Sequence, residues 1–489
     1  MARMHALRLP AFFAALVLGI AALAGCGGDS GGGAADESAA SFAPASVTAL
    51  ISLNSDFDSE QWNTAEELLD KFPARDDLVD ELRSAFTEEG IDFETEVKPA
   101  IGERIDVVLP AGGGLDGDFV LVTKAKDQAK MDTLLEQGDD PPAHEAIDGW
   151  TVIADEQATI DSFQREVEGE KLEDTEAWKE AGVESPDGAL ATVFVNGREA
   201  TDELRQQLNR AGAAGAFPDA QLEWARVTAE AVSNGIRVEG TAKSSGGSGS
   251  IENFAPKLLE DVPAGVLALL SFNGQQGAAQ LKEQLEGTPG LQNDLGEIER
   301  FLGTTLDELT ELFAGEGVLY VRAGAPLPEV TLVLEQADPA AAVATLDRLA
   351  RSAGGFLDAR PEESTIDGVS VKTLTLGPVK VSYAGFDGKL VLTSLAAAIS
   401  NRSGVDKLAD DAEFQAASEA AGLPDESAGF LYLRLGELAE LATGYAELAF
   451  GESGIPPEVD ANLRPLQSLL AFSSQDGDES HFTGFLEIE

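Results

Sequence analysis

The strongest constraint on the fold is an internal duplication, in which one order of landmarks runs twice along the chain, at roughly 43–244 and 252–489. The apolar segment 47–54 (VTALISLN) matches 266–273 (VLALLSFN), and each segment follows a proline-containing lead-in. Further landmarks recur in the same order: Gly102-Glu103 with Gly315-Glu316, Asp127 with Asp338-Pro339, Ile147-Asp148-Gly149 with Ile366-Asp367-Gly368, and Pro186-Asp187 with Pro424-Asp425. This repetition predicts two divergent tandem copies of one fold.

Hairpins dominate the predicted strands. Copy one closes with strands at 227–233 and 236–242, and copy two with strands at 467–474 and 481–488, each pair around a short turn. Copy two also contains a clear hairpin over 379–393. Successive hairpins without regular β-α-β alternation predict a mostly antiparallel sheet rather than a doubly wound parallel one.

Amphipathic helices are expected to cover one face of each sheet. Segment 338–350 shows the pattern, because its apolar side chains fall on one side: Ala342, Val343, Leu346 and Leu349. Asp347 and Arg348 are expected to point outward. Sheet and helices together predict an α+β fold for each copy.

The first 25 residues read as a signal peptide. Arg3 and Arg8 supply positive charge before an apolar run at 11–24, which is shorter than the roughly 20 residues of a membrane-spanning helix. The run ends in Leu23, Ala24, Gly25 and Cys26, which resemble the lipobox of bacterial lipoproteins. That resemblance implies cleavage before Cys26 and a diacylglycerol on its sulfur. The alternative is an ordinary secretory signal with an incidental cysteine.

Lipidation also accounts for the cysteine usage, because Cys26 is the one cysteine of the chain and cannot form an internal disulfide. Two acyl chains suffice for stable anchoring. We therefore expect the protein on the extracytoplasmic face of the cell membrane, with the membrane as a partner through the lipid anchor.

Small and polar residues separate the remaining parts. The stretch after Cys26, rich in Gly, Ala and Ser, predicts a flexible tether, and the Gly/Ser run near 248 predicts a linker between the copies. The predicted organisation is a signal peptide at 1–25, lipidated Cys and tether at 26–42, copy one at 43–244, linker at 245–251 and copy two at 252–489.

The chain is strongly acidic. Its 33 Lys and Arg residues oppose 87 Asp and Glu residues, which gives a formal net charge of −54. Such a charge is repelled by nucleic acid and by anionic headgroups, so neither is an expected partner. Cationic, neutral or apolar partners remain, and we consider an apolar ligand or another envelope protein.

The lipobox at Cys26, the proline lead-ins before Val47 and Val266, and the Gly-Glu pairs together resemble a family of actinobacterial envelope proteins catalogued as domain of unknown function 3352. The resemblance spans nearly all of the chain after the signal peptide. It implies a lipid-anchored, extracytoplasmic protein with a two-copy α+β fold. It implies no reaction, because the family has none assigned.

No catalytic set assembles from the sequence, and no cofactor is expected. Residues 28–32 (GDSGG) match a serine-hydrolase motif, but they lie in the tether with no strand before them. After processing, His144 in a predicted loop and His481 in the final strand are too few for a catalytic triad or a histidine metal site.

One loop carries part of a calcium-binding pattern. Asn54, Asp56 and Asp58 alternate oxygen ligands, but the sixth position is Ser59 rather than Gly and the twelfth is Ala65 rather than Glu. These three residues are weak metal candidates. The alternative is a solvated loop whose acids cap a helix that starts near Gln61.

Three functions stay open on this basis. The first is a non-catalytic binding or interaction module of the cell envelope. The second is a carrier of a lipid or other apolar ligand, with the hairpin 379–393 lining a cavity. The third is a hydrolase that uses paired carboxylates, although no pair can be chosen among 87 acids.

Overall fold

The computed structural model describes residues 38–88, 90–111, 119–137, 141–183, 188–210, 221–246, 252–275, 277–278, 282, 291–324, 327–357, 360–377, 379–399, 406–450 and 456–489. The predicted signal peptide, the lipobox with Cys26, the GDSGG segment, the landmark Pro186-Asp187 and most of the tether and linker lie outside these residues. Their assignments therefore stay predictions.

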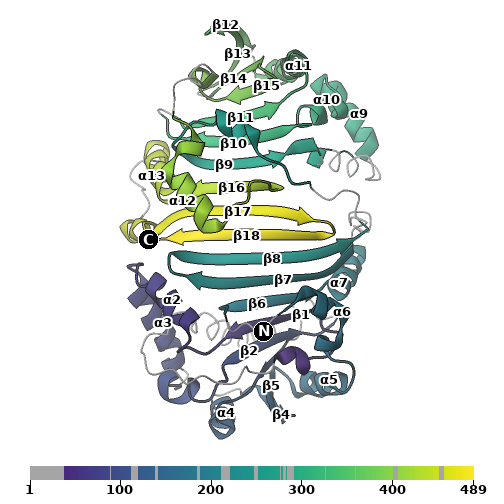
Figure 1. Cartoon of the computed structure of the whole chain (residues 1–489), viewed down its shortest axis with the longest axis vertical. Helices are drawn as coiled ribbons and strands as arrows, with labels where there is room; N and C mark the ends of the chain where they lie inside the picture. The colour runs from purple at the N-terminus through teal and green to yellow at the C-terminus, as the bar shows by residue number, and fades with distance from the viewer. Residues whose placement is uncertain are drawn as a thin grey trace.

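In this part of the chain, eighteen strands form one open antiparallel sheet (Figure 1). The strands are β1 Ala49–Asn54, β2 Arg104–Leu109, β3 Val120–Thr123, β4 Ala143–Ile147, β5 Trp150–Ala154, β6 Ala191–Asn196, β7 Gln221–Val232, β8 Gly235–Ser245, β9 Val266–Asn273, β10 Glu316–Arg322, β11 Glu329–Glu335, β12 Glu362–Ile366, β13 Val369–Leu376, β14 Val379–Phe386, β15 Lys389–Thr393, β16 Gly429–Arg434, β17 Leu466–Asp476 and β18 Glu479–Ile488. Their pairings give the order β4-β5-β3-β2-β1-β6-β7-β8-β18-β17-β16-β9-β10-β11-β15-β14-β13-β12.

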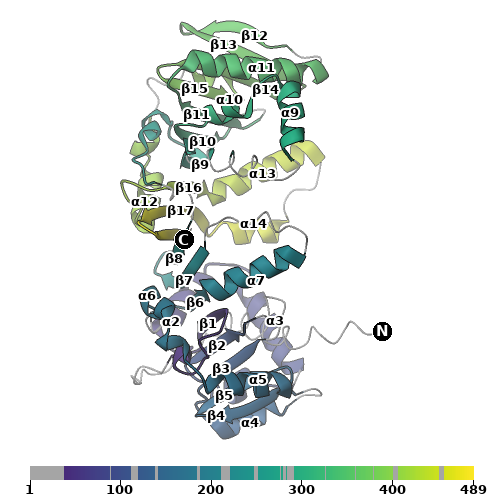
Figure 2. The same cartoon turned by 90° about the vertical axis from the view of Figure 1, so that its right-hand side faces the viewer.

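Helices pack on both faces of this sheet; in Figure 2, α12 lies on one side and α7 and α13 on the other. The helices are α2 Glu60–Leu69, α3 Arg75–Glu88, α4 Gln128–Leu135, α5 Gln157–Val167, α6 Glu176–Ala181, α7 Gly197–Arg210, α9 Leu291–Leu302, α10 Leu306–Glu311, α11 Pro339–Leu357, α12 Ala412–Ala421, α13 Leu435–Phe450 and α14 Pro457–Leu463. Shorter helical turns are Ala39–Ser41, Phe93–Val97, Leu172–Asp174, Lys257–Asp261, Ala396–Ile399 and Leu408–Asp410. The predicted α+β class with a mostly antiparallel sheet is confirmed.

The expectation of one covered face is wrong, because several strands are apolar on both sides. In β3, Leu121 belongs to one buried cluster with α2, α3 and α4, and its neighbours Val120 and Val122 belong to another with α5 and α6. Every residue of β5 is buried as well. Strands that are apolar on both faces need a cover on each side.

The two predicted halves share this sheet because β8 pairs with β18, from Gly235 opposite Glu487 to Lys243 opposite Glu479. A small apolar cluster centred on Leu68, Ala231 and Ile488 packs at the junction. Outward from it, both halves show the same succession of strands: β8-β7-β6-β1-β2-β3 on one side and β18-β17-β16-β9-β10-β11 on the other.

The hairpin predicted over 379–393 is confirmed as β14 and β15, which turn at Asp387-Gly388 with positive φ at both residues. Asp148-Gly149 makes the same turn between β4 and β5. Because β5 pairs with β3 in the first half and β15 pairs with β11 in the second half, the β4–β5 turn and the β14–β15 turn occupy equivalent positions in the two halves. The sequence had matched it with Asp367-Gly368, because all three turns share the same two-residue signature.

The tether was predicted too long at its end. Ala39–Ser41 forms a short helical turn, and Ala39, Ala40 and Phe42 are buried. The Phe42 ring stacks on Trp150, with 5.6 Å between ring centroids. Residues 38–42 thus belong to the folded first half, because one aromatic and two alanines can be buried although the surrounding composition is that of a spacer.

Helix α11 begins as predicted, where the Asp338 side chain accepts hydrogen bonds from the N–H groups of Ala340 and Ala341. Asp347, which was expected to point outward, instead faces the sheet. It accepts a hydrogen bond of 2.7 Å from the Tyr383 hydroxyl and pairs with Lys372. When a helix packs on a sheet, residues beside its apolar stripe can also contact the strands, and Asp347 is one of these residues.

Within the described residues, we find no helix with the length and apolar character needed to span a membrane.

Candidate functional site

A pocket of about 520 Å³ opens where the ends of β16, β17 and β18 meet α12, α13 and α14, beside the point marked C in Figure 1. Its wall is formed by Glu413, Ala416, Tyr432, Arg434, Gly436, Glu437, Ala439, Glu440, Asp460, Leu463, Arg464, Gln467, Ser468, Glu487 and Glu489. These residues belong to six elements or their ends, so the pocket exists only in the folded sheet.

Strand alternation brings the central residues to the pocket. Phe430, Tyr432 and Arg434 point to one face of β16; the first two enter the core, and the third lies at the strand end. Helix α13 follows β16 at once, which places Glu437 beside Arg434. On the other side, Asp411 caps α12 by accepting from its first N–H groups.

Arg434 ties these elements together. Its guanidinium lies 2.6 Å from the Glu437 carboxylate and 4.0 Å from that of Asp411, and it also pairs with Glu413. The side chain is 12 % exposed, so screening by water is reduced compared with a surface pair. Arg434 therefore acts as a clamp between the starts of α12 and α13.

The wall of the pocket is acidic. It carries six carboxylate residues, Glu413, Glu437, Glu440, Asp460, Glu487 and Glu489, against the two arginines Arg434 and Arg464. Arg464 pairs with Asp460 at 2.8 Å. The excess negative charge attracts cations and repels anions.

Tyr432 is the most deeply buried polar residue of this wall, with 1 % of its surface exposed. Its ring packs edge-on against Phe414 at 5.2 Å. Among the described residues, none forms a hydrogen bond with its hydroxyl. Burial, followed by the charges of Asp411, Glu437 and Glu487, raises the pKa of Tyr432 above its usual range, so the hydroxyl keeps its proton.

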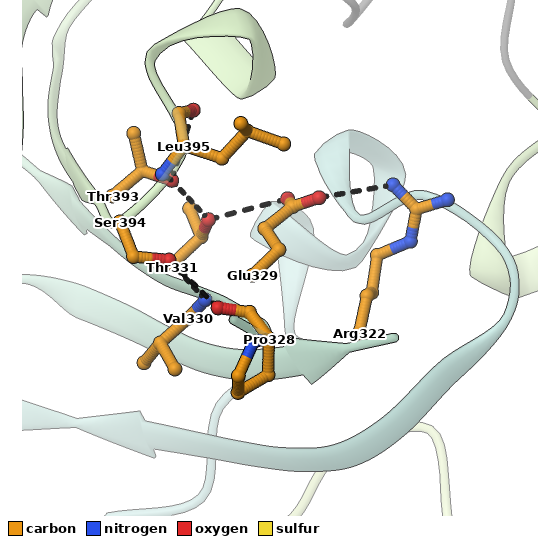
Figure 3. Close-up of polar contacts among 8 residues, drawn as sticks. All are labelled: Arg322, Pro328, Glu329, Val330, Thr331, Thr393, Ser394 and Leu395. Carbon is orange, nitrogen blue, oxygen red and sulfur yellow. Dashed lines mark hydrogen bonds and ion pairs between the residues drawn. The ribbon is translucent and has the colours of Figure 1, made fainter. Parts of the chain in front are cut away.

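A second polar cluster lies at the ends of β10, β11 and β15 (Figure 3). The buried Glu329 carboxylate lies 3.3 Å from both the Arg322 guanidinium and the Thr331 hydroxyl. Thr331 also bonds Thr393, and Ser394 accepts from the N–H of Val330 and donates to the Pro328 carbonyl. These hydrogen bonds join the ends of β10, β11 and β15, so the cluster serves to fix the strand ends.

The remaining buried acids give no support to a carboxylate hydrolase. In the described part of the molecule, the buried acids are Asp106, Glu316 and Glu329, and none of them lines the pocket. Asp106 accepts a hydrogen bond from Ser52 inside the first half. Glu316 accepts from the N–H groups of Leu258 and Lys257 in the second half, and burial raises its pKa.

The weak metal candidates are occupied by structural contacts. Asn54 donates to the Ala189 carbonyl and accepts from the N–H of Asp56, and Asp58 pairs with Lys98 at 2.9 Å. Helix α2 is capped by Ser59 rather than by the acids that we expected. Across the described residues, no group of three or more His, Cys, Asp or Glu side chains is arranged to hold a metal ion.

The two histidines are not brought together. His144 lies in β4 rather than in the predicted loop, with its Nδ1 atom 3.2 Å from the Pro142 carbonyl. His481 lies in β18, as expected, 3.2 Å from the Thr241 hydroxyl. The hairpin 379–393, which we considered as a cavity lining, does not contribute to the pocket.

Together these features define an α+β protein with a long antiparallel sheet and an acidic pocket at its strand ends. The family model of DUF3352, described as a protein of unknown function, matches residues 133–488. The chain therefore belongs to the DUF3352 family.

Comparison with curated proteins gives no match. Among solved structures, the chain is similar to crystal form III of TP0453, with 14 % identity and a TM-score of 0.25 over 46 % of this chain and 78 % of that one. Crystal form I of the same protein gives 13 % identity and the same TM-score over 46 % and 77 %. Likeness at this TM-score carries no conclusion about this chain.

Proposed function

We propose that this chain is a lipid-anchored, extracytoplasmic protein of the cell envelope that binds a polar ligand without catalysing a reaction. The observation that carries the proposal is the pocket of about 520 Å³ with a largely polar wall. This volume falls in the range of small-molecule sites, and a few convergent polar groups are what such sites use for orientation.

The anchor and the actinobacterial envelope location rest on the sequence around Cys26. If Cys26 carries the lipid, Cys26→Ser should move the protein from the membrane pellet to the soluble fraction, and Ser30→Ala should leave it in the pellet. Mass spectrometry of the amino-terminal peptide should find the diacylglyceryl modification on the wild type. Membrane retention of Cys26→Ser would refute the anchor.

An origin by duplication is part of the same proposal. Its support is the equal succession of strands outward from β8 and β18, with β1 and β9 in matching places. We accordingly keep the divergent copies at 43–244 and 252–489, connected at 245–251. The strand β8 reaches Ser245, so the connection is shorter than its composition indicated.

Native mass spectrometry tests the binding role. Protein extracted from its own membrane should carry a polar small molecule, and the variant Glu440→Gln/Glu487→Gln should lose it. Glu362→Gln/Glu363→Gln, on the edge strand β12, is the matched control because it removes two charges far from the pocket. Turnover of a substrate that depends on a single residue would contradict the proposal.

A lipid or apolar-ligand carrier is the second candidate, because the central sheet leaves apolar side chains exposed on one face. Val227, Phe482, Leu270 and Val330 are 37–46 % exposed, and the strand registers place all four on the same face. If this face carries cargo, extracted protein should retain lipid, and Phe482→Gln should release it while the pocket variants do not.

A further inference from the structure

The Tyr432 side chain is almost wholly buried in the wall of the pocket, and its hydroxyl has no hydrogen-bond partner among the described residues. Buried polar groups are almost always hydrogen-bonded, since leaving water without a new partner is costly. Tyr432 is 1 % exposed, and no described residue bonds its oxygen. The residue contributes to the wall of the pocket, so a molecule held in the pocket can supply the missing bond.

The first half shows that the hydroxyl is not needed for packing. Strand β6 lies between β1 and β7 as β16 lies between β9 and β17, and this places Phe194 where the second half has Tyr432. Phe194 is also 1 % exposed, and it packs edge-on against Trp178 at 5.0 Å. The same aromatic contact thus forms with and without the oxygen.

The charges beside Tyr432 indicate what the hydroxyl would bind. On the same face of the sheet, the next row of residues is Arg434, Ser468 and Glu487, and Ser468 donates to Glu487 at 2.7 Å. Arg434 is already paired with three carboxylates. Within the described residues, Glu440, Glu487 and Glu489 have no arginine or lysine ion pair, so their charge is available at the pocket.

Building on the proposed binding role, we propose that this pocket takes a small organic cation with a protonated amine. Tyr432 and Glu487 bind the ammonium group, and Glu440 and Glu489 favour its charge near the pocket mouth. An ammonium group offers three N–H donors and no acceptor, which suits a hydroxyl oxygen and carboxylates. A divalent metal is a poorer match, because no metal-holding group of three ligands exists among the described residues.

Calorimetric titration with 1,4-diaminobutane tests this proposal. It should be done in about 150 mM salt, which screens the general attraction of a chain with a net charge of −54 for any cation. We expect saturable binding with one site per chain. The neutral analogue 1,4-butanediol and the anionic analogue succinate should give no saturable heat.

Two variants locate the site. Tyr432→Phe and Glu487→Gln should each weaken diamine binding at least tenfold, and Glu362→Gln should change it less than twofold. Tyr432→Phe should fold normally because Phe194 occupies the equivalent place, and an unchanged circular dichroism spectrum and melting temperature would show this. Absent saturation, or affinity unchanged by both variants, would overturn the proposal.

Failure of this inference can be told apart from failure of the binding role. If the diamine does not bind but extracted protein carries another polar molecule that the Glu440→Gln/Glu487→Gln variant loses, the pocket binds a ligand of a different class and the cation assignment is wrong. If no molecule is carried and the diamine does not bind, both the inference and the proposed function fail.

Discussion

Each of the buried acids in the described part of the molecule has a different kind of partner. Asp106 accepts from a serine hydroxyl, Glu329 pairs with an arginine, and Glu316 accepts from two backbone N–H groups. A buried carboxylate is tolerated when it is paired or hydrogen-bonded. These side chains therefore hold local structure in place and are sensitive points for stability.

Glu316→Ala should lower the free energy of unfolding by about 1–3 kcal/mol, because it leaves the N–H groups of Leu258 and Lys257 without an acceptor. Burial raises the pKa of Glu316, so its ionised form is disfavoured in the folded state. The stability that the protonated Glu316 side chain contributes to folding is therefore fully present below the pKa of the unfolded chain, about 4.3, and is lost as the pH rises through the pKa of the folded state.

Urea unfolding of the wild type and Glu316→Gln at pH 7 and pH 4.5 checks this sign. The stability of the wild type relative to Glu316→Gln should increase at the lower pH. A difference that stays constant between the two pH values would show that Glu316 titrates alike in the folded and unfolded chain.

Asp347→Ala should lower the free energy of unfolding by about 1.5–3 kcal/mol, because a charge-assisted hydrogen bond to the buried Tyr383 is lost. Its neighbour Arg348, which pairs with Glu308 at 2.7 Å and is more exposed, is the control. Arg348→Ala should cost less than about 1 kcal/mol. Urea unfolding measures both, and equal effects would contradict the inward position of Asp347.

The pocket residues could not be selected from the sequence. Its acids lie between positions 413 and 489 with no fixed spacing, and they are a few among 87 acids. Tyr432 and Arg434 read as ordinary positions of an alternating strand. The presence of Phe194 at the position equivalent to Tyr432 points to the hydroxyl, but this equivalence becomes visible only when the strand orders of the two halves are compared.

At the scale of elements, strands and tight turns were the most predictable features. The hairpin of β14 and β15 was found because Asp387-Gly388 separates two alternating strands. Lengths were less predictable: β7 and β8 extend well beyond 227–242, since charged and polar residues mark their ends, although Trp224 near the start of β7 is buried in the apolar core. Partners across the sheet, such as β8 with β18, leave no local trace in the sequence.

Gly235→Ala should destabilise the junction between β8 and β18. A Cβ at this position would lie 2.1 Å from the Leu486 carbonyl oxygen, so the paired backbones would have to separate. We expect a loss of about 1–3 kcal/mol, the usual cost of overpacking, seen as a lower melting temperature.

Gly188→Ala provides the control, because a Cβ there meets nothing within 4 Å. Its melting temperature should stay close to that of the wild type. Equal melting temperatures for Gly235→Ala and Gly188→Ala would contradict the close approach at the junction.

For the whole molecule, the continuous sheet predicts one cooperative unfolding transition. The halves are joined by nine residue pairs between β8 and β18 and by the apolar cluster at Leu68, Ala231 and Ile488. Scanning calorimetry should give a single peak with equal calorimetric and van't Hoff enthalpies. Gly235→Ala should shift this whole peak, and two peaks of which one moves would show independent halves.

The position of β18 has a consequence for how the chain acquires its shape. Strand β8 ends at residue 245, but β18, which pairs with the edge of β8 that faces away from β7, is made from residues 479–488. While the second half is still being synthesised, the backbone N–H and C=O groups along one edge of β8 have no pairing partner and can pair with a strand of another molecule. Binding of a chaperone to the nascent chain during this interval would prevent β8 from pairing with a strand other than β18.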